Sequence, residues 1–290
     1  MKEITDILTK LWNSPRMADL GLMLLGAGNG FAVIKFLDYP LEWNFLYFIV
    51  ILLIVLTFGG ALLDSLSDRN NRDILYRNGI GVNAIIFLTF LLFGLSIAPL
   101  YQVIHLTSGS SFFILLVSVT ISLILLREFL NKTILIYGLN ELLVSFMASS
   151  LMPLLVVANQ FAKIPNVLYP VSAFNLFAIF SSQLLKKFLN NTDRNQQFDK
   201  RNYFIGLYSI QKMILALFST GYIFSFFIIY SLKLDFELFL PILFSFPATA
   251  YILANLLKLK RQEDSLPLKM SANYLGVIVN IFWFVVLWCY

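Results

Sequence analysis

Two aspartates at the end of a long apolar run could hold a metal ion. Asp64 and Asp68 are four residues apart in the stretch Gly59–Arg77, so on a helix they lie one turn apart on the same face. Two carboxylates placed in this way can share Mg²⁺, which prefers oxygen ligands and takes the remainder from water and substrate phosphates. Arg72 and two further arginines supply cations that match phosphate. The stretch therefore predicts a site for Mg²⁺ and a phosphorylated ligand.

An ordinary charged helix end that enters water is the alternative, and in a soluble protein it would be favoured. The composition changes this balance. The 290 residues are 59% hydrophobic and 13% charged, with a mean hydropathy of +0.81, whereas soluble domains have about 25% charged residues. These values predict a polytopic membrane protein. At the end of a spanning helix, carboxylates are costly unless they face a wet cavity or a ligand.

The charge balance and the reactive side chains exclude several other classes of protein. A net charge of +5 on so apolar a chain indicates orientation in a bilayer, so no nucleic-acid partner is expected. The single cysteine, Cys289, excludes a disulfide framework and a thiolate metal site. The single histidine, His105, excludes a multi-histidine metal site and fits an interfacial loop.

The apolar runs predict an all-α fold, a bundle of nine transmembrane helices around a central cavity, which forms one domain over residues 1–290. An amphipathic helix that lies on the membrane surface is expected before them, over residues 1–16. The first span is rich in glycine, which suits close helix packing. The predicted spans are Met17–Phe36, 43–64, 80–102, 109–127, 134–160, 167–186, 203–230, 236–257 and 270–290.

The distribution of basic residues predicts the orientation of the bundle. All but three of the 21 lysines and arginines fall on one side of the predicted spans, and Lys35, Lys163 and Lys233 fall on the other. By the positive-inside rule the N-terminus is cytoplasmic. We expect a multi-pass integral membrane protein, of a bacterial inner membrane, in contact with membrane lipids.

A second polar segment, Lys186–Lys212, lies on the same predicted face of the membrane as Asp64. Its carboxylates Asp193 and Asp199 could bind a metal, and its cations, which include Lys186, Lys187, Arg194, Lys200 and Arg201, could meet a phosphate. By itself the segment could equally be a solvated basic loop. Its pairing with the first motif predicts that helices 2 and 6 are neighbours at one shared site.

These motifs resemble those of the UbiA superfamily of intramembrane prenyltransferases, which have nine helices, a cytoplasmic N-terminus and aspartate motifs after helices 2 and 6. The first motif corresponds to Gly60-x3-Asp64-x3-Asp68, with Arg72 at the arginine that often follows. The second corresponds to Asn190–Tyr203. In the segment Tyr137–Leu155, Glu141 stands where the naphthoate branch, of the menaquinone pathway, has a glutamate.

The chain departs from this pattern at both motifs. Gly60 replaces an asparagine and so removes one oxygen ligand, and an ungapped alignment from Lys200 and Arg201 places Asn191 and Asn195 where the family has aspartates. Amide oxygens can still ligate Mg²⁺ but do not neutralise it. The resemblance therefore fits either a divergent enzyme or a relative that has lost activity.

The resemblance implies transfer of a prenyl group from an isoprenoid diphosphate to an aromatic quinone precursor or another lipophilic acceptor, with Mg²⁺ as cofactor. Glu141 and Asn140 are also polar residues within a span, which suggests a functional role in orienting the acceptor or removing its proton. The implied catalytic residues are Asp64, Asp68 and Glu141, the diphosphate-binding residues are Arg72, Arg194, Lys200 and Arg201, and the metal ligands are Asp64, Asp68, Asn191, Asp193, Asn195 and Asp199.

Two other functions stay open. The spacing Gly60-x3-Asp64-x3-Asp68 also matches the second half of the CDP-alcohol phosphotransferase signature, but the residues upstream do not supply the first half, and nine spans exceed the six usual in that family. A catalytically inactive membrane scaffold or a transporter is the other alternative. For a transporter, Glu141 and Pro153 are the only supporting residues within a span.

Overall fold

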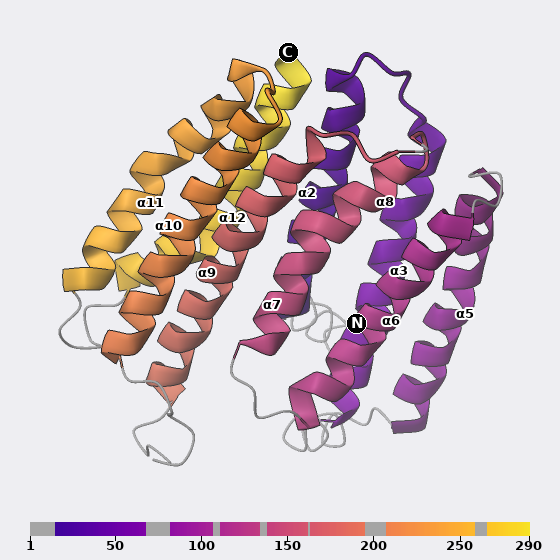
Figure 1. Cartoon of the computed structure of the whole chain (residues 1–290). Helices are drawn as coiled ribbons and strands as arrows, with labels where there is room; N and C mark the ends of the chain where they lie inside the picture. Colours follow the sequence, from indigo (N-terminus) through magenta and orange to yellow (C-terminus); the bar gives the residue numbers. More distant parts are fainter. Residues whose placement is uncertain are drawn as a thin grey trace.

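The computed structural model describes residues 15–67, 82–106, 111–133, 138–161, 163–194, 207–258 and 266–290. Every regular element in these ranges is helical (Figure 1). The elements are α2 (Pro15–Phe36), α3 (Trp43–Ser67), α5 (Val82–Leu106), α6 (Ser111–Thr133), α7 (Leu139–Phe146), the π-helix η1 (Met147–Leu151), α8 (Met152–Ala158), α9 (Leu168–Arg194), α10 (Leu207–Ser231), the 3₁₀-helix η2 (Phe236–Phe239), α11 (Leu240–Lys258) and α12 (Leu266–Cys289).

The nine predicted helices are confirmed within the described ranges. Because α7, η1 and α8 follow one another without a break, they form one rod, and η2 leads directly into α11. The surface helix expected over residues 1–16 falls almost wholly outside the described residues. In lipid, helices are favoured because every backbone polar group must find its hydrogen bond inside the protein.

The helices have the length and surface of a membrane protein. Seven of them carry apolar stretches of 19 to 22 residues, long enough to cross a bilayer, and shorter apolar stretches lie in α6 and α12. Large apolar side chains lie on the outside of the bundle, for example Phe87 and Phe90 on α5 and Phe227 on α10. A surface of this kind is stable against lipid chains and not against water.

Helix α2 lies at the centre of the bundle and packs against α12, α8, η1 and α3 (Figure 1). The pair α3–α5 lies on one side of it, and α9 packs with α10 and α12 on the other. The expectation that helices 2 and 6 are neighbours is therefore wrong for their described parts, because α2 and the α7–α8 rod separate α3 from α9. The two sequence motifs therefore indicate that their helices reach the same membrane face. They do not indicate that the helices pack against each other.

Two glycines allow α2 to approach the rod closely. A Cβ at Gly26 would collide with the carbonyl oxygen of Ala148, and a Cβ at Gly30 would lie 2.8 Å from both the carbonyl oxygen of Pro153 and the Cβ of Val156. The rod is itself irregular at this level. Pro153 lacks an N–H and its ring conflicts with the carbonyl four residues earlier, and the π-turn η1 just before it accommodates that conflict.

We predict that Gly26→Ala destabilises the protein, because the added methyl forces α2 away from η1 at a cost of about 1–3 kcal/mol. Gly21→Ala is the matched control, since Gly21 lies in the same helix with no atom within 4 Å of the added Cβ. That control should be neutral or stabilising, as alanine favours helix over glycine by about 1 kcal/mol. The measurement is thermal unfolding of both variants in detergent; a Gly26→Ala variant as stable as Gly21→Ala would contradict the close packing.

Candidate functional site

The elements that carry the sequence motifs meet at one end of the bundle. Helices α3 and α9 finish at this end and α7 begins there, at the lower side of the bundle in Figure 1. We call it the basic end, because most of the lysines and arginines lie in or beside its connections. The fold therefore brings both predicted motifs to the same membrane face, although α3 and α9 do not pack together.

The first motif is described in part. Gly60 and Asp64 lie one turn apart within α3, close to the point where the helix finishes at Ser67. The side chain of Asp64 lies outside the described part of the structure, as do Asp68 and Arg72. The placement of Asp64 at the basic end agrees with a site at the membrane surface, and its role as a metal ligand stays a prediction.

The second motif has a similar status. Asn191, Asp193 and Arg194 lie in the last turn of α9, and their side chains fall outside the described part. The other predicted residues of this motif, Asn195, Asp199, Lys200 and Arg201, lie outside the described residues altogether. Convergence of the two carboxylate groups on one metal therefore stays a prediction. In the described side chains, no three histidine, cysteine, aspartate or glutamate residues come together in a group that could hold a metal.

Glu141 is the predicted site residue whose surroundings are described in detail. It lies in the first turn of α7 and is buried, with 7% of its surface exposed. Its Oε1 atom is 2.8 Å from the Nζ atom of Lys187 in α9, which is partly exposed. This ion pair joins the start of α7 to the part of α9 that approaches the basic end. The interaction brings an acidic candidate and a phosphate-matching cation into direct contact.

The position of Glu141 at the start of α7 also stabilises its charge. The N-terminus of a helix carries a partial positive charge, and Glu141 is the third residue of α7 after the cap Gly138. Gly138 has φ 96°, a left-handed conformation that glycine adopts without a Cβ clash. The second carboxylate oxygen, Oε2, is buried and has no hydrogen-bond partner among the described residues. One oxygen of Glu141 is thus held by Lys187, and the other is buried without a described partner.

Polar side chains next to Glu141 are satisfied within their own helix. The Ser145 hydroxyl donates to the carbonyl oxygen of Glu141 at 2.6 Å, and the Ser149 hydroxyl donates to the carbonyl oxygen of Ser145 at 2.6 Å. These hydroxyls therefore do not compete for the free oxygen of Glu141. Their bonds to carbonyls four residues earlier allow polar residues inside an apolar bundle.

The sequence reasoning missed several polar residues inside the bundle. Asp19 in α2 is buried, and its position as an acidic residue within the first predicted span was the available signal. Asn29 in α2 donates from Nδ2 to Oδ1 of Asn280 in α12 at 2.7 Å, and Asn280 donates to the carbonyl oxygen of Gly276. No local sequence pattern pairs residues that are 251 positions apart. This bond fixes α2 against α12 in the bundle core.

Comparison with solved structures identifies the fold. The chain superposes on a structure of a digeranylgeranylglyceryl phosphate synthase, a membrane prenyltransferase of the UbiA superfamily, with a TM-score of 0.61 and 11% sequence identity. The match covers 96% of this chain and 100% of the other. No family model matches the sequence, and no curated protein matches it in sequence comparison. The expected UbiA-like helical fold is confirmed, and the likeness does not distinguish the naphthoate branch.

We predict that Lys187→Met lowers the free energy of unfolding by about 1–3 kcal/mol, because the buried carboxylate of Glu141 loses the cation that balances it. Lys186→Met makes the same change at the adjacent residue of α9 and serves as the matched control. The double variant Glu141→Gln/Lys187→Met should recover part of the loss. Denaturation of the three variants in detergent tests this, and equal losses for Lys186→Met and Lys187→Met would speak against the ion pair.

Proposed function

We propose that this chain is an integral membrane prenyltransferase of the UbiA superfamily. It transfers a prenyl group from an isoprenoid diphosphate to a lipophilic acceptor, with Mg²⁺ as cofactor. The observation that carries the proposal is the match of the whole helical bundle to a membrane prenyltransferase. The placement of Asp64 and the second motif at the same end of that bundle supports it, because a diphosphate site needs both at one membrane face.

The reaction sets a clear physical demand on the site. The bond between the first carbon of the prenyl chain and a diphosphate oxygen breaks, and that carbon bonds to a nucleophile of the acceptor. Diphosphate leaves, and the acceptor nucleophile loses its proton. Negative charge therefore develops on the leaving group, and fixed cations near it lower the barrier. The carbocation character of the prenyl group also requires that water be kept away.

The carboxylate and amide ligands of this chain fit Mg²⁺ in type. Asp64 and Asp68 would hold the ion, together with oxygen atoms from Asn191, Asp193, Asn195 or Asp199. When bound, Mg²⁺ neutralises charge on the diphosphate. Gly60 provides no ligand, so fewer oxygen atoms face the metal than the family motif would supply. We therefore expect Mg²⁺ to bind more weakly than it would to the family motif. The lysines and arginines should then contribute more to binding of the diphosphate.

The cations of the chain bind and orient the diphosphate in this proposal. Arg72, Arg194, Lys200 and Arg201 are the candidates from the two motifs. Lys187 is a further candidate. Its Nζ atom lies 2.8 Å from Oε1 of Glu141, which holds the ammonium group near the basic end. Fixed in this way, Lys187 loses little further freedom when it meets a phosphate. The free Oε2 of Glu141 can accept a hydrogen bond from the acceptor or take its proton.

The acceptor is an aromatic quinone precursor or another lipid. The segment around Glu141 resembles the naphthoate branch, which favours an aromatic acceptor. The matched structure is named for a glyceryl phosphate product, which makes a lipid phosphate the second candidate. We assign the basic end to the cytoplasmic face, following the positive-inside rule, in a bacterial inner membrane. Nucleic acid has no part in this function.

We predict that Asp64→Asn reduces prenyl transfer by about 10²-fold. The neutral amide would hold Mg²⁺ less tightly, so the negative charge that develops on the leaving diphosphate would be less stabilised. Asp38→Asn is the matched control, since Asp38 lies exposed in the turn after α2 at the opposite end of the bundle. The measurement is transfer from labelled isoprenoid diphosphates to naphthoate, benzoate and glycerol phosphate acceptors, with and without Mg²⁺.

Three results would contradict the Asp64 assignment or the proposed function. Normal turnover by Asp64→Asn at unchanged expression would remove Asp64 from the site. Failure of the unmodified protein to bind any prenyl diphosphate at millimolar Mg²⁺ concentration would favour the inactive scaffold. If cytidine diphosphate alcohols reacted in place of prenyl diphosphates, the CDP-alcohol phosphotransferase alternative would replace the proposal.

A further inference from the structure

Polar side chains from three helices meet in the core of the bundle. Asn29 of α2, Asn175 of α9, and Asn280 and Trp283 of α12 are all fully buried, with 0% of their surface exposed. We call these four residues the asparagine cluster. We propose that the cluster binds a water molecule, which joins α9 to α2 and α12. This inference does not depend on the proposed prenyltransferase function.

The packing of α9 against α12 places Asn175 opposite Asn280. A Cβ at Gly276 of α12 would lie 3.5 Å from the side chain of Ile179 of α9, and the contacts along this interface show that the two helices are antiparallel. Asn175 comes four residues before Ile179, and Asn280 comes four residues after Gly276. Residues four apart share a helix face, so both asparagines lie one turn further along the same interface.

Trp283 and Asn29 complete the cluster from α12 and α2. Trp283 lies three residues after Asn280, on the same face of α12, and its ring centroid is 6.5 Å from that of Phe174, the neighbour of Asn175 in α9. Asn29 donates from Nδ2 to Oδ1 of Asn280 at 2.7 Å. Helices α2 and α9 both pack against α12 but have few contacts with each other. A ligand held by the cluster therefore links two helices that α12 otherwise separates.

The hydrogen bonds of the cluster fix which of its atoms are donors and which are acceptors. Asn280 donates from Nδ2 to the carbonyl oxygen of Gly276 at 2.8 Å, so its Oδ1 must be the atom that accepts the bond from Asn29. The Oδ1 of Asn29 is then an acceptor without a partner among the described residues. Asn175 adds a second such acceptor, Oδ1, and a donor, Nδ2, and Trp283 adds a second donor, Nε1.

The unmet atoms of the cluster match the hydrogen-bonding groups of water. Two of them are acceptors and two are donors, and a water molecule donates two hydrogen bonds and accepts two. A cation would face the N–H groups and an anion would face the amide oxygens, so the ligand is neutral. Internal waters make about three hydrogen bonds to polar groups that are otherwise unsatisfied. The asparagine cluster offers that number of partners and one more.

The cluster lies too deep in the membrane for bulk water to satisfy it. Asn29 is seven residues from the end of α2 at Phe36, and Asn280 is nine from the end of α12 at Cys289. At ~1.5 Å per residue the cluster is about 10–14 Å from the end of the bundle that lies opposite the basic end. The hydrocarbon core of a bilayer is about 30 Å thick. Polar groups at this depth must find their hydrogen bonds inside the protein.

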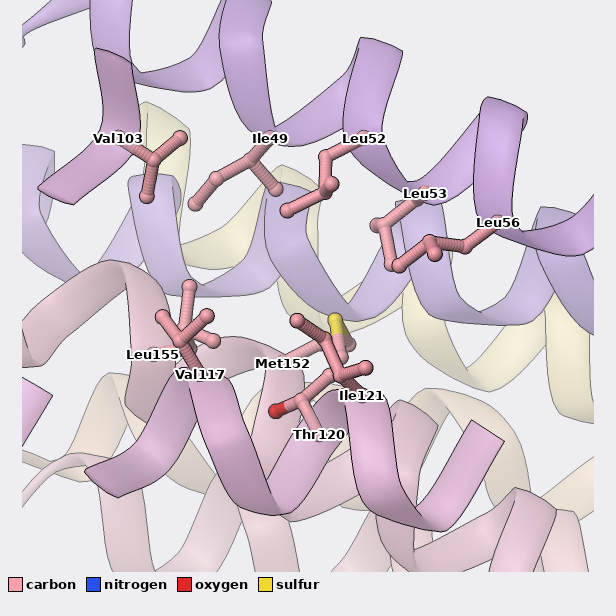
Figure 2. A pocket seen from close by; sticks show the side chains of 10 residues that line it. All are labelled: Ile49, Leu52, Leu53, Leu56, Val103, Val117, Thr120, Ile121, Met152 and Leu155. Atoms are coloured by element: carbon pink, nitrogen blue, oxygen red, sulfur yellow. The ribbon is translucent and has the colours of Figure 1, made fainter. Parts of the chain in front are cut away.

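An apolar cavity where α3, α5, α6 and α8 meet provides a contrast within the same bundle (Figure 2). Nine of its ten lining residues are aliphatic or methionine, and its volume is about 20 Å³. The exception, Thr120, donates its hydroxyl to the carbonyl oxygen of Leu116 at 2.8 Å, so the described wall has no unmet polar group. Apolar cavities of this kind stay dry. Its surroundings therefore serve as the dry reference for the asparagine cluster.

Radiolytic hydroxyl-radical footprinting of the full chain in lipid nanodiscs tests for the water directly. Radicals that form from a bound water oxidise the side chains beside it. Phe174 is buried next to the asparagine cluster, and Phe113 is buried one turn from Val117 of the apolar cavity. The two are the same residue type with similar burial, so they differ in the presence of the water. We expect Phe174 to be oxidised several-fold faster than Phe113.

The sign of a stability change gives a second test. Asn175→Leu removes the amide and keeps a side chain of similar size. With water bound, the variant loses hydrogen bonds and leaves the other groups of the cluster short of a partner, so its melting temperature falls by a few degrees. A dry amide without a partner gives the opposite sign, because an apolar replacement removes its burial cost. Asn255→Leu is the control, since Asn255 is exposed on α11 and donates only within its own helix, to the carbonyl oxygen of Tyr251.

Three outcomes would overturn the inference. Oxidation of Phe174 no faster than that of Phe113 in the unmodified protein would show that no water is bound, and this measurement needs no variant to fold. A melting temperature of Asn175→Leu equal to or above that of the unmodified protein would show that the amide has no partner. Oxidation of Phe174 that is unchanged in folded Asn175→Leu would place the water outside the asparagine cluster.

Discussion

The close contact between α2 and the irregular helix of α7, η1 and α8 is the constraint on which the rest of the bundle depends. In lipid there is little hydrophobic driving force between helices, so association relies on close packing and on polar contacts. Gly26 and Gly30 provide the close packing, because they have no side chain and so allow the backbone of α2 to contact the backbone of η1 and of Pro153. The Asn29–Asn280 hydrogen bond provides the second on the other side of α2. Helix α2 is thereby fixed between the two halves of the molecule.

The π-turn explains how one helix serves two different environments. Before the turn, α7 packs chiefly against α9 and presents Glu141 to Lys187. After the turn, α8 packs chiefly against α2, and Met152 and Leu155 reach the apolar cavity beside α3 and α6. The extra residue of a π-turn changes the helix register, which is how a helix can change neighbours without a break. Pro153 makes that turn favourable at this level of the bundle.

The sequence was sufficient to predict the helices and insufficient to predict most of their contacts. An apolar run long enough to span a membrane must form a helix to satisfy its own backbone hydrogen bonds. The predicted span 43–64 therefore agrees closely with the helix Trp43–Ser67. Glu141 was recognisable because a carboxylate within a span needs a partner. Its partner Lys187 was not, because contact between α7 and α9 follows from three-dimensional packing and has no fixed spacing. The prediction that helices 2 and 6 are neighbours was wrong for the same reason, since no sequence spacing determines which helices pack together.

The rod and α3 together form a gradient from polar to apolar side chains along the bundle. The polar end of the rod, at Glu141, lies at the same end of the bundle as Asp64 of α3, and its buried charge is balanced by Lys187. Further along, the side chains of both helices that line the apolar cavity are aliphatic or thioether. A ligand with a charged head and a hydrocarbon tail matches this gradient in one orientation only, since the reverse would bury its charge among leucines. Burial cost alone would therefore fix the orientation of such a ligand before any specific contact forms.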